Sequence, residues 1–343
     1  YAAVDASQVD NVGAYFKNTT GLLVSDVTFK NIPNEAMLLL ASQAATVINC
    51  VFTNCALLSI SNNLTQCALY TRWTTGSFFL NNRVFDCFEG GLCLGTLSSS
   101  NVMAGNYSTN TAGGEGFFVG QSSYNWLVGN TNLNSAYLGD PLNYPPENSK
   151  YWGSGAGIAL QGVGHAELTV GNAIGYNYIW RTGAEGINSL TASNTLIFGN
   201  EVYAANCFGH GNPAGAILVS ATPQARVFDN IIQSNACRAI AILSSKNCDI
   251  TNNLVAPANT LNGIYLSNSS GVNTNANYAE DPITNQTGNQ EIVVDNADAS
   301  GVAITGNWVS STSTPGYYGT NYCTMITRVL RAANGFNTPP RFP

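Results

Sequence analysis

Short apolar segments recur along almost the whole chain. Each begins with a small residue and continues as an apolar–any–apolar triplet, as in Gly-Ile-Ala-Leu at 157–160 and Ala-Ile-Ala-Ile at 239–242. Apolar residues alternate with a period of two in these segments, which is the pattern of a β-strand with one buried face. Gly, Asn, Ser and Thr fill the intervals, as tight turns require, and the repeat has no convincing helical period. The pattern predicts an all-β chain of short strands.

An asparagine follows these segments at a nearly constant distance of about 14 residues. The unit repeats at about 23 residues, and the variation in its length falls in the other half, which is typical of a stacked repeat. In a parallel coil with a rise of ~4.8 Å, equivalent Asn amides can pass hydrogen bonds from turn to turn, whereas a hairpin sandwich gives no reason for a fixed Asn. The predicted ladder positions are Asn49, Asn82, Asn106, Asn130, Asn172, Asn200, Asn230, Asn253 and Asn307, with Asp26 in the first copy.

These features resemble the pectate-lyase-like superfamily of single-stranded right-handed parallel β-helices. It includes pectate lyases, polygalacturonases, alginate epimerases and phage tailspike depolymerases, and the chain is most similar to the tailspike type. The resemblance covers roughly residues 11–310. It implies a right-handed parallel β-helix, a solenoid of about ten coils. The shared motifs are architectural, and the signature catalytic motifs of the first three groups are absent from the sequence, so the resemblance alone does not identify the chemistry.

The expected domain organisation is a β-helix at 1–310 followed by a C-terminal cap or tail at 311–343. The chain opens almost directly into a first coil, so we expect an N-terminal cap or neighbouring domain to be missing. Near the other end, Met325, Ile326 and Val329 have helix-like spacing, which favours a short capping helix over a strand exchanged with a neighbour.

Composition narrows the possible partners. Only 9% of the residues are charged, against ~25% in ordinary globular chains, and the net charge is −7. A surface rich in amides and hydroxyls suits a polysaccharide, and it opposes nucleic acid, which needs a basic face. No apolar run is long enough to span a membrane. No Asp-rich calcium loop or Cys-x-x-Cys pair is present, so we expect neither a metal site nor a cofactor.

The cysteines leave two alternatives open. Nine are present, and Cys207 and Cys237 fall at equivalent places in adjacent coils. Stacked thiols fit this arrangement at least as well as a disulfide. The same two alternatives apply to a second group, which consists of Cys55, Cys67, Cys87 and Cys93.

Insertions in a solenoid project from one side and usually form its working surface. The longest runs over 131–154, and the corresponding turns of the next two coils are also rich in aromatic or basic residues. Aromatic rings stack on sugars, and basic side chains donate hydrogen bonds. The alternative is that these rings only pack the loops onto the rod. The predicted substrate-binding residues are Tyr144, Lys150, Tyr151, Trp152, Tyr178 and Trp180.

One column, immediately before the small residue of each unit, contains candidate catalytic carboxyls. Glu115 and Glu185 lie two coils apart in it, with Ala156 between them. A separation of ~9–10 Å leaves room for a water, which is the arrangement of an inverting glycosidase. Two alternatives remain. The glutamates could be ordinary turn residues, or His210 as base with Arg181 beside it could support a polysaccharide lyase.

The sequence is therefore compatible with three functions. The first is a tailspike-type polysaccharide depolymerase, extracellular or on a virion surface, with hydrolysis favoured over elimination. The second is a free secreted hydrolase or lyase, and the third is a carbohydrate-recognising adhesin or rod without activity. Several outward strand positions are apolar, which favours a covered surface and hence a homotrimer. These positions are Leu38, Tyr70, Phe118, Leu218 and Tyr265.

Overall fold

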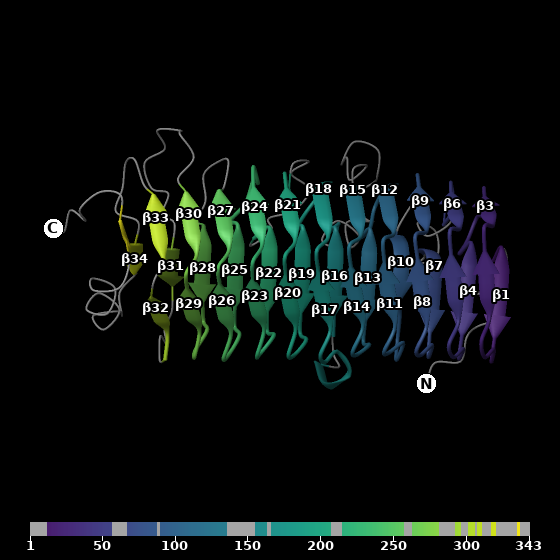
Figure 1. Ribbon diagram of the computed structural model, residues 1–343, viewed down its shortest axis with the longest axis horizontal. Helices are drawn as coiled ribbons and strands as arrows, with labels where there is room; N and C mark the ends of the chain where they lie inside the picture. The colour runs from purple at the N-terminus through teal and green to yellow at the C-terminus, as the bar shows by residue number, and fades with distance from the viewer. Residues whose placement is uncertain are drawn as a thin grey trace, which may run out of the picture.

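The chain forms a long rod of stacked coils in a computed structural model (Figure 1). The first and the last described strands lie toward opposite ends of the rod. The residues that the structure describes are 12–56, 67–87, 90–135, 155–162, 166–206, 215–256, 263–280, 292–295, 301–305, 307–310, 317–319 and 335–336.

Three parallel sheets run along the rod, and each coil contributes one strand to each sheet in turn, except that the last described coil has no described strand in the second sheet. Sheet I contains β1 (Ala14–Lys17), β4 (Met37–Leu40), β7 (Cys67–Arg72), β10 (Gly90–Leu94), β13 (Phe117–Gly120), β16 (Ile158–Gln161), β19 (Ile187–Leu190), β22 (Ile217–Ser220), β25 (Ile240–Leu243), β28 (Ile264–Ser267), β31 (Ile292–Asp295) and β34 (Tyr317–Gly319). Sheet II contains β2 (Leu23–Ser25), β5 (Thr46–Ile48), β8 (Phe78–Leu80), β11 (Val102–Ala104), β14 (Trp126–Val128), β17 (Ala173–Gly175), β20 (Leu196–Phe198), β23 (Arg226–Phe228), β26 (Asp249–Thr251), β29 (Asn273–Asn275) and β32 (Ala303–Thr305). Sheet III contains β3 (Thr28–Lys30), β6 (Val51–Thr53), β9 (Arg83–Phe85), β12 (Tyr107–Thr111), β15 (Thr131–Ser135), β18 (Tyr178–Thr182), β21 (Glu201–Tyr203), β24 (Ile231–Gln233), β27 (Leu254–Ala256), β30 (Tyr278–Glu280), β33 (Trp308–Ser310) and β35 (Gly335–Phe336). A 3-10 turn, Ala166–Leu168, precedes β17.

This topology confirms the predicted right-handed parallel β-helix. Within the described residues, sheets I and III each contain twelve strands, so the rod has more coils than the roughly ten expected from the sequence. Two short strands from the stretch 311–343 also join the sheets: β34 pairs with β31, and β35 pairs with β33. The predicted capping helix around Met325 lies outside the described residues.

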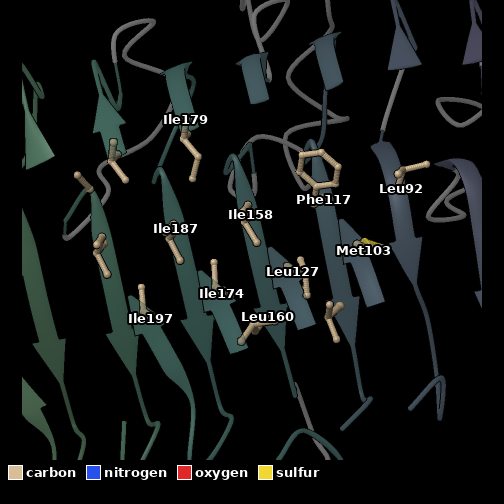
Figure 2. Close-up of a cluster of buried hydrophobic side chains, with 14 of the residues drawn as sticks. Leu92, Met103, Phe117, Leu127, Ile158, Leu160, Ile174, Ile179, Ile187 and Ile197 are labelled. Atoms are coloured by element: carbon tan, nitrogen blue, oxygen red, sulfur yellow. The ribbon is translucent and has the colours of Figure 1, made fainter. Parts of the chain in front are cut away.

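The core fills the space between the sheets with one layer of side chains per coil. Figure 2 shows part of this stack, in which Phe117 and Ile158 come from sheet I and Leu127 and Ile174 come from sheet II. These four side chains are fully buried. The middle residue of each three-residue strand points inward because successive side chains alternate across a strand. The period-two pattern of the sequence therefore corresponds to this layered core.

The predicted asparagine ladder lies at the turn between sheets II and III. Asn106 illustrates the bonding. Its Oδ1 accepts hydrogen bonds from the backbone N–H of Asn82 (2.9 Å) and from Asn82 Nδ2 (3.1 Å), while its own Nδ2 donates to the Phe79 carbonyl (2.8 Å) and to Asn130 Oδ1 (2.9 Å). Each amide thus satisfies buried polar groups of the neighbouring turns. The ladder consists of Asn82, Asn106, Asn130, Asn177, Asn200, Asn230, Asn253, Asn277 and Asn307.

Two predicted ladder positions are wrong. Asn49 is exposed with a φ of 55°, and Cys50 occupies its coil's ladder position, where the Cys50 N–H donates to Asn82 Oδ1 at 3.0 Å. Asp26 is likewise a turn residue with positive φ. The error arises because Asn and Asp are favoured both at left-handed turn positions and as hydrogen-bonding side chains.

Asn172 belongs to a second, shorter ladder at the turn between sheets I and II. Its Oδ1 accepts from the N–H of Asn125, whose Oδ1 accepts in turn from Asn101. The main ladder in that coil passes through Asn177, five residues later. Both positions follow a turn residue of positive φ, Gly171 and Tyr176, and the sequence pattern selected Asn172 because a small residue precedes it, as in other copies. Asn277 was missed, although it lies 14 residues after Gly263, the distance typical of the other copies.

The cysteines follow both alternatives that the sequence left open. Cys67 and Cys93 form a disulfide between β7 and β10, with Cα atoms 6.1 Å apart. Cys55 and Cys87 are buried free thiols in hydrogen-bonding contact on adjacent coils, a stacked pair. Cys237 is also a buried free thiol, and its expected neighbour Cys207 lies outside the described residues.

The outer faces of the sheets differ in exposure. On sheet I the outward residues Leu38, Tyr70 and Leu218 are buried within the single chain, so their apolar character needs no second subunit. These three residues therefore give no support to a subunit interface on sheet I. Phe118 and Tyr265 of the same set are half-buried, and the Arg238 guanidinium lies 4.0 Å from the Tyr265 ring.

Sheet II carries a row of large exposed apolar side chains near one end of the rod. The first residues of β2, β8 and β14 are Leu23, Phe78 and Trp126, which are 65%, 45% and 49% exposed. Backbone register places all three in one row along the rod, separated by Thr46 and Val102. An apolar row on a flat sheet is a candidate contact surface.

The ladder gives a first testable prediction. Replacing Asn130 by Ala removes a fully buried amide that bonds Asn106, Asn177 and the Met103 carbonyl, and leaves those partners unsatisfied. We expect a loss of roughly 3 kcal/mol or more in the free energy of unfolding, since each orphaned buried group costs ~1–3 kcal/mol. Denaturant unfolding followed by circular dichroism measures it.

Asn49→Gly is the matched control, because glycine accepts the positive φ of that turn and the exposed side chain has no place in the ladder. It should change stability by less than about 0.5 kcal/mol. Equal losses in the two variants would contradict a ladder that includes Asn130 and omits Asn49.

Candidate functional site

The candidate carboxyls lie at the corner where sheet III turns into sheet I. Glu115 and Glu185 lie two residues before the first residues of β13 and β19. The N–H of Gly116 bonds the Ala156 carbonyl, and the N–H of Gly157 bonds the Glu185 carbonyl, so the three residues occupy one column on successive coils. The predicted spacing of two coils therefore holds, and it places the two backbones about 10 Å apart.

Both carboxyls are buried, with 7% of Glu115 and 6% of Glu185 exposed. Burial disfavours the charged form and raises the pKa of the Glu185 carboxyl to about 7, against the opposing effects of backbone and Asn188 hydrogen bonds. Among the described residues, Oε2 of Glu185 has no hydrogen-bond partner. A carboxyl that keeps its proton near neutral pH can serve as a general acid.

The same column contains a third buried carboxyl, that of Glu35. Cys67 and Gly90 occupy the column on the two coils between Glu35 and Glu115. Burial raises the pKa of Glu35 to about 7, and the charge of Arg72 opposes that shift. Three coils separate Glu35 from Glu115, too far for two carboxyls to act on one glycosidic bond.

The described aromatic candidates lie on a different sheet. Tyr178 and Trp180 project from β18 on the outer face of sheet III and are 39% and 38% exposed. The Tyr203 ring of β21 lies 5.7 Å from Tyr178, and the Arg181 guanidinium lies 5.2 Å from the Trp180 ring. Only a short turn separates this group from Glu185, but its rings face solvent while the carboxyls are buried.

The remaining predicted site residues cannot be placed in this geometry. Tyr144, Lys150, Tyr151, Trp152 and His210 lie outside the described residues. Asn188 is the neighbour that the sequence pattern did not reveal: it is a buried outward residue of β19, three residues after Glu185, and hydrogen-bonds its carboxyl. The signal for it was a polar residue at an outward strand position that is apolar in most other coils.

Metal-binding clusters and membrane-spanning helices are both absent from the described part of the chain. In the described ranges, no three His, Cys, Asp or Glu side chains gather as a metal site would require. Across that same part of the chain, no helix is long and apolar enough to cross a bilayer.

Comparison with known proteins supports the fold. A family model described as a right handed beta helix region matches residues 3–139. Tailspike protein 3 of bacteriophage CBA120 is similar to 97% of this chain, with a TM-score of 0.58 and 10% identity. The match to the Dettilon tailspike protein covers 94% of this chain, with a TM-score of 0.50 and 12% identity. The match to a double mutant of the periplasmic alginate epimerase AlgG covers 92% of this chain, with a TM-score of 0.52 and 12% identity.

The chain covers 53% of the CBA120 protein, 61% of the Dettilon protein and 77% of the epimerase. It thus spans about half to three fifths of the length of the two tailspikes. No curated protein sequence matches it. The chain is a right-handed parallel β-helix with the fold of these three proteins, and at such low identity the likeness concerns the fold.

The buried carboxyls give a second prediction. The folded chain holds a proton on Glu185 up to about pH 7, whereas the unfolded chain releases it near 4.5. The higher proton affinity of the folded chain adds to the free energy of unfolding. This stabilisation is fully present below about pH 4.5 and is lost as the pH rises from 4.5 to 7, by at most about 3 kcal/mol. We expect Glu185→Gln to lose less stability than the parent between pH 5 and pH 8 in denaturant titrations.

Glu201→Gln is the control, because Glu201 is an exposed glutamate on β21. Its pH profile should follow that of the parent. A Glu185→Gln profile as steep as that of the parent would show that Glu185 ionises in the folded chain as it does in water.

Proposed function

We propose that the chain binds a polysaccharide and hydrolyses it with Glu115 and Glu185. The observation that carries the proposal is the pair of buried carboxyls in one column, two coils apart. Their backbone separation of about 10 Å is compatible with carboxyl groups ~6.5–9.5 Å apart, the range that admits a water between a general base and the sugar. This geometry favours an inverting glycoside hydrolase.

The environment of Glu185 favours the role of general acid for that residue. Its pKa of about 7 keeps the proton available to the leaving oxygen, and Asn188 holds the carboxyl in place. Glu115 then acts as the base that activates water. The exposed rings of Tyr178 and Trp180 supply stacking surfaces for sugars beyond the cleavage point.

Similar folds support the choice of a polysaccharide, since two of the compared proteins are tailspikes and the third is an alginate epimerase. By this analogy we expect the chain to act outside the cell or on a virion surface. The same analogy is compatible with a free secreted enzyme and with a recognition rod that binds a glycan without cleaving it.

A lyase is the second candidate reaction. Arg181 lies at the sheet III edge of the corner, where a guanidinium could neutralise a uronate, and His210 would act as the base. The contact between Arg181 and the Trp180 ring favours the hydrolase, because it already engages the guanidinium in the unliganded chain.

An activity screen gives the third prediction. Parent, Glu185→Gln and Glu115→Gln would be incubated with bacterial capsule, O-antigen and plant polysaccharides. We expect the parent to release reducing ends and either variant to be slower by about 10²–10⁴-fold, the usual contribution of an acid or base. Absorbance of unsaturated sugars is read in parallel.

The exposed Glu201→Gln variant is again the control and should retain full activity. Unsaturated products that persist in both variants and vanish in Arg181→Ala would replace the hydrolase by a lyase. Binding of a glycan without any product would leave a recognition rod.

We also propose that copies of the chain associate through sheet II, as a homotrimer. The exposed row of Leu23, Phe78 and Trp126 runs along the rod axis, and only another elongated surface can cover it over several coils. The proposed trimer interface therefore lies on sheet II and not on sheet I, where the sequence had predicted it.

Mass measurement gives the fourth prediction. Analytical ultracentrifugation of the chain should show a trimer, and Trp126→Lys with Phe78→Glu should shift the mass toward a monomer by placing charges on the proposed contact. The matched control is Tyr178→Lys on sheet III, which should leave the mass unchanged. A monomeric parent would remove the proposal.

A further inference from the structure

A concavity lies on the outer face of sheet I, at the opposite ends of the strands from the carboxyl column. It has a volume of about 180 Å³, and its walls come from four successive coils. Tyr70 of β7 and Phe118 of β13 contribute rings, and Gln121 and Gln161 contribute amides. Thr96 also lines it.

Two glycines allow the rings to lie close to the strand ends. A Cβ atom on Gly95 would fall 2.5 Å from the Tyr70 hydroxyl oxygen, and one on Gly120 would fall 2.6 Å from Cε1 of the Phe118 ring. Any side chain at either position would displace a ring. Phe118 is half-buried, so part of its ring stays available to a ligand.

Tyr70 is fixed more firmly than a surface ring needs to be. The Arg72 guanidinium stacks 5.1 Å from the ring centre, and its Nε donates to the Tyr70 hydroxyl at 3.2 Å. The disulfide between Cys67 and Cys93 ties the strand beneath Tyr70 to the next coil. The wall of the pocket is therefore rigid before any ligand binds, which lowers the entropic cost of binding.

We infer that this pocket is a subsite for one neutral pyranose ring of the glycan. Its volume is below the ~300–1,000 Å³ of sites for drug-sized molecules, so it suits a single ring. Phe118 offers an aromatic surface to the C–H face of a sugar, while the amides and the hydroxyl both donate and accept hydrogen bonds, as sugar hydroxyls do. None of the lining residues is charged, which favours a neutral sugar over a uronate.

This inference rests on the proposed binding of a polysaccharide. It adds a second place at which the chain would contact the glycan. Six residues of extended chain separate Gln121 from Glu115, which corresponds to about 20 Å. The pocket and the carboxyl column therefore contact different units of one glycan laid across sheet I. The pocket holds a unit remote from the cleaved bond and contributes to affinity rather than to chemistry.

The experiment measures binding of methyl α-D-glucoside, galactoside and mannoside by saturation-transfer NMR and calorimetry, with methyl α-D-galacturonoside as the charged probe. At least one neutral probe should bind the parent. Phe118→Ala and Gln161→Ala should each weaken that binding by about two- to tenfold, as loss of one ring contact or one amide implies.

The controls are Phe228→Ala on sheet II and Gln233→Ala on sheet III, which remove equally half-buried side chains of the same types elsewhere. Both should bind the neutral probe normally. Thermal unfolding shows whether each variant is folded, and Gln161→Ala, which removes only a half-buried amide, remains informative if Phe118→Ala fails to fold.

The outcomes separate this inference from the proposed function. Cleavage of a polysaccharide with no neutral probe bound, and with the KM unchanged in Phe118→Ala and Gln161→Ala, would overturn the pocket and leave the hydrolase standing. Probe binding that depends on Phe118 in a chain that cleaves nothing would support the pocket and overturn the hydrolase. Binding of the uronoside alone would overturn the choice of a neutral sugar.

Discussion

The interaction on which this fold depends is the side-chain amide that bonds from one coil to the next. At the turn between sheets II and III the backbone bends too sharply to satisfy all its own groups, and each ladder Asn supplies both a donor and an acceptor there. Because each amide also bonds its counterpart one coil away, neighbouring coils must adopt the same cross-section. The ladder fixes the register of three sheets at one corner.

A fixed register has a consequence for function. Residues far apart in sequence come to lie in one column, as Glu115 and Glu185 do, because position within the coil counts and sequence distance does not. Extra residues can then be inserted at another corner without disturbing the columns. The carboxyl column and the pocket around Phe118 lie at the two ends of the same strands, so sheet I can contact a long polymer at two places.

Particular residues show why the sequence predicted some of this and not the rest. The sequence revealed the column that contains Glu115 and Glu185 because a small residue and an apolar triplet follow each member. These markers align the equivalent positions of successive coils. Asn49 was misassigned because an Asn one position away is equally suited to the left-handed turn beside the ladder. The disulfide between Cys67 and Cys93 could not be chosen from several buried cysteines, because pairing depends on how the Cβ atoms of adjacent strands are oriented.

By itself the sequence determined the architecture, since strand alternation and turn residues are local properties repeated in nearly every coil. Tertiary structure decided which surfaces are open. The outward residues Leu38 and Leu218 on sheet I are covered within the chain, while Trp126 on sheet II faces solvent, although all three are outward apolar residues in the sequence. Exposure decided the proton affinity of Glu185 in the same way, because burial depends on every segment packed around a residue and not on the residues adjacent to it in the chain.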